Sequence, residues 1–379
     1  MFKKYKFWLL AAVGGIALSF IMVLSQILTV HTTVKNLPLA IVNEDPTNSI
    51  SKKIVDQLKN VTSVGDTNPT TLKWTTVKST AALQQDMSKQ KFYGAIIIKR
   101  HFGENMATLA TATPTKPSVT TVINQAKNPT VSTAVTNLFS HMTTTISGTI
   151  SKDIITQFAS HQQPIPIVVA KTIAQPLNVT NQIVHPTENK VNATAIYFQP
   201  LWLSSVIISL MLFYAAKDGQ LRGKNKYRLA TMQLITAASL AIFIGIMTPL
   251  YTTWLLDYHF QNFWTIALFA TIAEFSFIMI ILGILSWTGF IGLPLFVLLM
   301  FFALPILQLA PEMLSHFYRD SIYPWLPMRF LIDGMRGIIY YHDGIWHTPT
   351  FNLLWVMAIG MFLLIAKVFL SQTRNIIAK

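Results

Sequence analysis

Long apolar stretches alternate with one extended polar region along the chain. A bilayer core about 30 Å thick needs about 20 apolar residues in a helix that rises about 1.5 Å per residue. Six stretches have that length, and only Glu274 and, near one end, Lys367 bring charge into them. They cover residues 7–30, 196–216, 229–251, 263–286, 290–310 and 351–370. This pattern predicts a polytopic α-helical membrane protein with six spans.

The first stretch follows Lys3, Lys4 and Lys6, as the apolar part of a secretory signal peptide would. Its apolar run exceeds the roughly 7–15 residues of a signal sequence, and no small-residue cleavage site follows it. We therefore expect residues 1–30 to form a short cytoplasmic tip and an uncleaved first transmembrane helix.

Basic residues near the ends of the stretches orient the bundle, because cytoplasmic connections are enriched in lysine and arginine. Three basic clusters fall on one side: Lys3, Lys4 and Lys6; Lys217, Arg222, Lys224, Lys226 and Arg228; and Lys367, Arg374 and Lys379. We expect a multi-pass protein of the plasma membrane with both termini cytoplasmic. Residues 31–195 are then extracytoplasmic, between spans one and two, and residues 196–379 form a five-helix membrane domain.

Residues 31–195 are rich in Thr and Asn, with apolar residues in short runs. Strands are predicted at 37–43, 72–77, 92–98, 119–124 and 165–170, and helices at 49–59, 79–89 and about 130–160. This alternation is typical of a small α/β domain. It either captures a cargo or partner, or is a folded cap that orders the bundle.

Composition and motifs narrow the classes of function. Hydrophobic residues make up 52% of the chain and charged residues 12%, whereas soluble domains carry about 25% charged residues. The net charge of +14 includes the clusters that orient the bundle, so we expect the lipid bilayer as a partner and no nucleic acid. The absence of cysteine removes thiolate nucleophiles and Cys-ligated metal sites.

Three motifs of catalytic sites are absent from the sequence: the phosphate-binding G-x-x-x-x-G-K-[ST] loop, the zinc motif H-E-x-x-H and the nucleophile elbow G-x-S-x-G. The 9 histidines have no ligand spacing. We expect no enzyme, cofactor or metal in this chain, and any ATP hydrolysis belongs to a separate partner.

Glu274 lies in the middle of an apolar stretch, where an ionised carboxylate costs several kcal/mol unless it is paired or hydrated. Two interpretations stay open. The carboxyl belongs to a substrate path or proton relay, or it forms a buried hydrogen bond or ion pair between two helices.

The connection at about 311–350 is too apolar for a plain loop. Within it, Arg329, Asp333 and Arg336 follow helical spacing and form a polar stripe on an otherwise apolar helix. We expect a re-entrant or interfacial segment, and we take Arg329 or Arg336 as the candidate partner of Glu274.

Three segments carry a resemblance to a known family: LPLAIVNEDP at 37–46, AALQQDM through KFYGAIII at 81–98, and YPWLPMRFLIDGMRG at 323–337. Together with the order of one span, a large external domain and five further spans, they resemble the type-2 ABC exporter permease superfamily. The local sequence of these segments is similar to that of the phage infection protein (YhgE/Pip) branch. The order of spans and domains is similar to that of SNG1-like resistance proteins.

The resemblance implies a permease subunit that works as a dimer. In relatives, such a subunit is driven by a separate cytoplasmic ATPase.

In ATP-driven relatives, the permease contacts that ATPase through amphipathic coupling helices. One lies near the N-terminus and another lies in the first inner loop. Here about six residues precede the first stretch, and the loop 217–228 is basic without an amphipathic pattern.

We therefore expect a homodimeric membrane permease that exports a lipophilic or amphipathic compound, with a separate ATPase as a further partner to be tested. The alternative is a non-transporting envelope scaffold or receptor that acts through its external domain, in phage adsorption or secretion.

Overall fold

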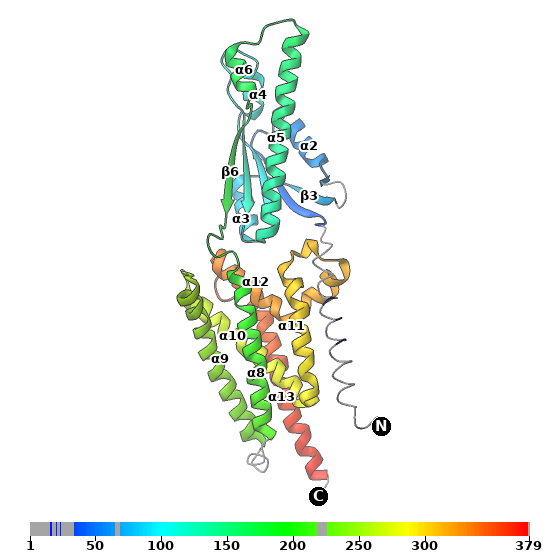
Figure 1. Ribbon diagram of the computed structural model, residues 1–379, viewed down its shortest axis with the longest axis vertical. Coiled ribbons are helices and arrows are strands. Elements are labelled where there is room, and N and C mark those ends of the chain that lie inside the picture. Colours follow the sequence, from blue (N-terminus) through cyan, green and yellow to red (C-terminus); the bar gives the residue numbers. More distant parts are fainter. Residues whose placement is uncertain are drawn as a thin grey trace. The chain divides into compact units, whose positions relative to one another are not determined.

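The computed structural model describes residues 34–64, 69–217 and 226–377, together with the single positions 16, 20 and 23. The chain divides into two compact units, Thr33–Glu188 and a second made of Met1–Thr32 with Asn189–Lys379. The expected anchor at 7–30 and most of the basic loop 217–228 lie outside the described residues. Each unit is described below by itself (Figure 1).

The unit at 33–188 is built on a six-stranded mixed sheet with the strand order β2-β3-β1-β4-β5-β6. Its strands are β1 (Leu37–Asn43), β2 (Ser63–Val64), β3 (Thr70–Val77), β4 (Gly94–Ile98), β5 (Ser118–Asn124) and β6 (Asn178–Val184). β1 is parallel to β3 and β4, and β5 is parallel to β6, while the pairs β2–β3 and β4–β5 are antiparallel. The central strands β1 and β4 are buried on both faces, as their continuous apolar runs predict.

In the described part of this unit, five helices accompany the sheet: α2 (Ser49–Asn60), α3 (Thr80–Ser88), α4 (Phe102–Thr108), α5 (Pro129–Ser160) and α6 (Ile167–Ile173). Side chains cap the first turns of three of them. Asn48 accepts from the backbone N–H of Ile50 at 2.8 Å, Ser79 caps α3, and Asn128 caps α5 directly before its first-turn proline. These caps satisfy backbone donors that the helices leave unpaired.

The helix α5 covers one face of the sheet. A Cβ at Gly94 would lie 2.8 Å from side-chain atoms of both Val135 and Phe139, so α5 approaches β4 closely. Trp74 on β3 stacks on Phe139 with ring centroids 6.2 Å apart. The opposite face packs against α3 in an apolar cluster that includes Ala40, Val42, Leu83, Met87 and Ile97.

The strand predicted at 165–170 is wrong. The structure has the helix α6 there, with its buried side chains on one helical face, and Ser151 of α5 donates to the carbonyl of Ile173 at 2.6 Å. The sixth strand is instead β6, which pairs with β5 and leaves most of its side chains exposed. A polar edge strand lacks the apolar alternation that the sequence could show, and β-branched residues made 165–170 look like a strand.

The other unit is helical, with α7 (Ala193–Ile196), α8 (Phe198–Lys217), α9 (Lys226–Leu256), α10 (Phe263–Thr288), α11 (Leu293–Gln308), α12 (Pro327–Tyr340) and α13 (Thr348–Ile377). Short helical turns, η1 (Gly289–Gly292), η2 (Pro311–Met313), η3 (Tyr318–Ile322) and η4 (Tyr323–Trp325), connect some of them. Among the described residues, four stretches are long and apolar enough to cross a membrane: Ala193–Lys217, Tyr227–Leu256, Phe263–Gln308 and Thr348–Leu370. Their length and composition are those of an integral membrane protein.

The third of these stretches contains two of the six expected spans. α10 ends at Thr288. The next residue, Gly289, has a φ of 68°, which suits glycine, and it begins η1, which leads into the separate helix α11. The 16 residues of α11 extend about 24 Å, which is less than a bilayer core of about 30 Å. The six-span topology stays a prediction.

α10 lies at the centre of the helical unit and packs against α8, α9, α12 and α13. A Cβ at Gly283 on α10 would lie 2.6 Å from the carbonyl oxygen of Gly360 on α13. Small residues of this kind let helix backbones approach closely in membranes. Large apolar side chains that are more than two thirds exposed include Trp254, Trp264, Trp355 and Phe362. Such surfaces are expected where helices meet lipid.

Candidate functional site

Glu274 is fully buried in the middle of α10. Its Oε1 lies 2.9 Å from the hydroxyl oxygen of Ser204 on α8, and its Oε2 has no hydrogen-bond partner. Within the described residues the carboxyl therefore has one hydroxyl partner and no cation beside it. An ionised carboxylate in such a place would be buried without compensation.

The hydroxyl of Ser204 has three acceptors within hydrogen-bond distance, one of which is the carbonyl oxygen of Leu201 at 3.1 Å. Its Oγ lies 2.7 Å from the carbonyl oxygen of Pro200 as well as 2.9 Å from Glu274. A serine hydroxyl donates once. The Ser204 hydroxyl donates to Oε1 of Glu274 or shares its proton with the carbonyl oxygens of its own helix. Ser204 therefore links the carboxyl of Glu274 to the backbone of α8.

Two further serines of α8 face the same helix. Ser205 donates to the carbonyl of Leu201 at 2.7 Å and lies 3.4 Å from the carbonyl oxygen of Glu274. Ser209 donates to the carbonyl of Ile278 on α10 at 3.1 Å. We call Ser204, Ser205, Ser209 and Glu274 the polar seam. The serines were not predicted as site residues, although three hydroxyls within one apolar stretch are a signal that the sequence contains.

The stripe Arg329, Asp333 and Arg336 forms an ion triad on α12. Nε of Arg329 lies 2.9 Å from Oδ2 of Asp333, and a guanidinium nitrogen of Arg336 lies 2.8 Å from Oδ1. The guanidinium of Arg329 also lies over the ring of Tyr323, 4.2 Å from its centroid. Burial, and then the Asp333 carboxylate, raise the pKa of Tyr323 to about 12.

The expected pairing of Glu274 with Arg329 or Arg336 is wrong, because both arginines pair with Asp333. Side chains three and four residues apart on one helix are neighbours, so Asp333 is within reach of both arginines without any tertiary contact. The structure thus separates the four candidate residues into two sites, the polar seam and the triad. The triad holds α12 together locally, and α12 packs on α10, where Phe269 lies against Gly334. The re-entrant or interfacial position of 311–350 stays a prediction.

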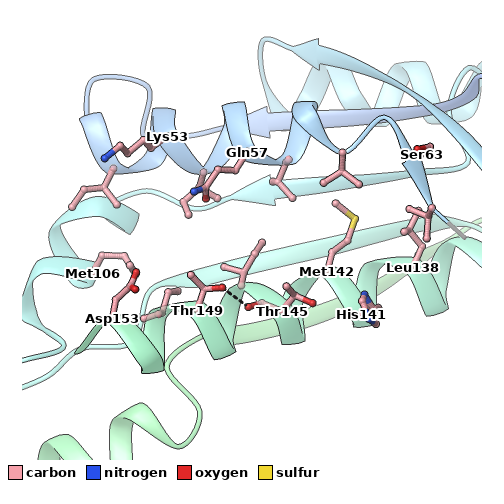
Figure 2. Close-up of a pocket in the computed structure, with 17 residues that line it drawn as sticks. Lys53, Gln57, Ser63, Met106, Leu138, His141, Met142, Thr145, Thr149 and Asp153 are labelled. Atoms are coloured by element: carbon pink, nitrogen blue, oxygen red, sulfur yellow. Dashed lines mark hydrogen bonds between the residues drawn. The ribbon is translucent and has the colours of Figure 1, made fainter. Parts of the chain in front are cut away.

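A groove of about 660 Å³ runs between α2 and α5 in the other unit, with Met106 of α4 at one end (Figure 2). Small-molecule sites in proteins have volumes of about 300–1,000 Å³. Six apolar side chains at four-residue spacing line its two walls: Ile50, Ile54 and Leu58 on α2, and Met142, Ile146 and Ile150 on α5. We call it the α2–α5 groove.

Polar side chains lie at both ends of the α2–α5 groove. Lys53 and Asp153 lie at one end on facing helices, and Ser63 and His141 lie toward the other end (Figure 2). The sequence predicted the apolar face of α2, but it gave no sign that this face meets α5 across a groove. The part of the chain that the structure describes has no group of three His, Asp or Glu side chains placed to hold a metal.

A family model described as a protein of unknown function, DUF3533, matches residues 8–349. The chain belongs to this family. The DUF3533 match spans the polar seam, the ion triad and the α2–α5 groove. No curated protein and no solved structure matches the chain.

Proposed function

We propose that this DUF3533 protein is a membrane permease subunit that exports a lipophilic or amphipathic compound. The observation that carries the proposal is the carboxyl of Glu274, buried in a bundle of apolar helices with one oxygen unpartnered. Buried polar atoms that only stabilise a fold are normally hydrogen-bonded. Ionisable residues inside a membrane mark substrate and ion pathways and proton relays.

In this proposal Oε2 of Glu274 accepts a hydrogen bond from a passing cargo or exchanges a proton with it. Ser204 holds the carboxyl in place through Oε1. The resemblance to type-2 ABC exporter permeases supports export, a dimer and a separate cytoplasmic ATPase. We place the protein in the plasma membrane with six spans, both termini cytoplasmic and residues 31–195 outside.

An envelope scaffold or receptor is the second candidate. The observation that favours it is the compact unit at 33–188 with its own groove. In that case the helical unit is an anchor, and substitutions in it affect the protein only through its stability.

The test is efflux of a fluorescent lipophilic dye from cells that express each variant. Glu274→Gln keeps the size of the side chain and an oxygen for Ser204, so we expect an unchanged Tm and loss of efflux. Gln233→Leu on α9 is the matched control, because it removes a buried hydrogen bond of 3.0 Å to the carbonyl of Leu212 away from the polar seam. It should lower the Tm and keep efflux. If efflux follows the Tm in both variants, the scaffold function is favoured.

A further inference from the structure

The two walls of the α2–α5 groove are elongated and mainly apolar, with Gln57, Thr145 and Thr149 as polar side chains between the ends. Between Ile50 and Leu58 the lining of α2 extends about 12 Å, and between Leu138 and Asp153 that of α5 extends about 22 Å, at about 1.5 Å per residue. Thr149 donates its hydroxyl proton to the carbonyl of Thr145 at 3.0 Å, so that proton is used within α5. A long, narrow and apolar body fits such walls.

One end of the α2–α5 groove carries both signs of charge. Lys53 on α2 and Asp153 on α5 are exposed on facing walls there (Figure 2). No ion pair joins them within the described residues. A head group with a phosphate near Lys53 and an ammonium group near Asp153 is complementary to this end, whereas a ligand of one sign would face one like charge.

The walls of the α2–α5 groove have few backbone groups that could form hydrogen bonds with a bound peptide. Both are helices, whose inner N–H and C=O groups are bonded within the helix. The one strand among the lining elements, β2, contributes only Ser63 and Val64. A peptide would bury unpaired backbone groups in the α2–α5 groove, which is costly, and a hydrocarbon chain has none to bury.

We propose that the α2–α5 groove binds a single-chain zwitterionic amphiphile. Its hydrocarbon chain lies between the walls, and its head group lies at the end formed by Lys53 and Asp153. This site is separate from the polar seam, and binding there does not depend on transport by the helical unit.

The test is photolabelling of the full chain in lipid nanodiscs with a lysophosphatidylcholine that carries a photoreactive group in its acyl chain. Labelled peptides are identified by mass spectrometry, with label in the helical unit as the internal reference. We expect label on α2 and α5. Ile146→Trp, which fills the groove, should reduce that label at least five-fold, whereas Ile155→Trp, on an exposed position of α5, should not.

Charge variants test the head group. Lys53→Glu and Asp153→Lys should each reduce the label on α2 and α5 several-fold. Unchanged label in Ile146→Trp would overturn the proposal, and stronger label in Asp153→Lys would overturn the zwitterionic assignment. Absence of label from α2 and α5 in the unchanged chain, with the helical unit labelled, would also overturn the proposal.

Discussion

The hydroxyl oxygen of Ser204 on α8 lies 2.9 Å from Oε1 of Glu274 on α10, and this contact joins two helices in the interior of the apolar bundle. Ser204 also lies 2.7 Å from the carbonyl oxygen of Pro200 and 3.1 Å from that of Leu201, both on its own helix. The same arrangement leaves Oε2 of Glu274 without a partner. In the polar seam, Oε1 of Glu274 thus makes a contact between two helices, and Oε2 of the same carboxyl has no hydrogen-bond partner.

The first prediction concerns the cost of removing that contact. Ser204→Ala leaves the buried carboxyl without its hydroxyl partner, so we expect a loss of about 1–3 kcal/mol in the free energy of unfolding. Ser209→Ala is the control, because it removes a bond to the carbonyl of Ile278 that does not involve Glu274. Its cost should be lower, about 1 kcal/mol. Denaturant unfolding in detergent measures both, and equal costs would contradict the role given to Ser204.

The second prediction concerns the ion triad on α12. Asp333→Asn leaves Arg329 and Arg336 as two like charges without their shared carboxylate. We expect a loss of about 3 kcal/mol in the free energy of unfolding, because partly buried guanidinium groups lose their counter-charge. Arg329→Gln keeps the pair of Asp333 with Arg336 and should cost about 1 kcal/mol. Thermal unfolding compares the two variants, and similar shifts in Tm would show that the triad is not one unit.

The third prediction uses two glycines of the unit at 33–188. Gly94→Ala should destabilise this unit by about 1–3 kcal/mol, because the new Cβ meets Val135 and Phe139 at 2.8 Å. Gly148→Ala in α5 has open space around it and should stabilise the unit by up to about 1 kcal/mol. Limited proteolysis of 33–188 in the full chain measures both. Equal protease resistance of the two variants would contradict the close packing of α5 on β4.

The sequence predicts those elements whose burial leaves a pattern along the chain. The apolar runs of β1 and β4 identify two central strands, and the apolar stretches identify the long helices. β6 was missed because an edge strand with polar side chains has no such pattern, and α6 was misread because isoleucine and valine also suit strands. Both elements depend on tertiary contacts, β6 on its pairing with β5 and α6 on its packing against α5.

Among the candidate site residues, too, contacts within one helix were predictable from the sequence and contacts between helices were not. Arg329, Asp333 and Arg336 were predicted as one stripe, because neighbours on a helix follow from spacing alone. The predicted partner of Glu274, Arg329 or Arg336, is wrong, because the actual partner Ser204 lies 70 residues away on another helix. The α2–α5 groove likewise depends on how α2 and α5 are placed on the sheet. This placement cannot be predicted from a local sequence pattern.

The fourth prediction concerns the side of the membrane on which the unit at 33–188 lies. The chain has no cysteine, so each introduced cysteine is the only one and the parent chain is the unlabelled control. Lys152→Cys lies on α5 and Lys217→Cys at the end of α8, and both positions are exposed. From the distribution of basic residues we expect a membrane-impermeant maleimide to label Lys152→Cys on intact cells. Lys217→Cys should react only after permeabilisation, and the reverse result would overturn the orientation.

The fifth prediction tests whether α10 and α11 are two spans or parts of one. Two crossings place Ser315, an exposed residue after α11, on the same side as residue 152. Ser315→Cys should then react with the impermeant maleimide on intact cells. If α10 and α11 share one crossing, the chain after α11 stays on the cytoplasmic side, and Ser315→Cys reacts only after permeabilisation. Because α11 is short for a bilayer core, this position discriminates between the two topologies more sharply than the helix lengths do.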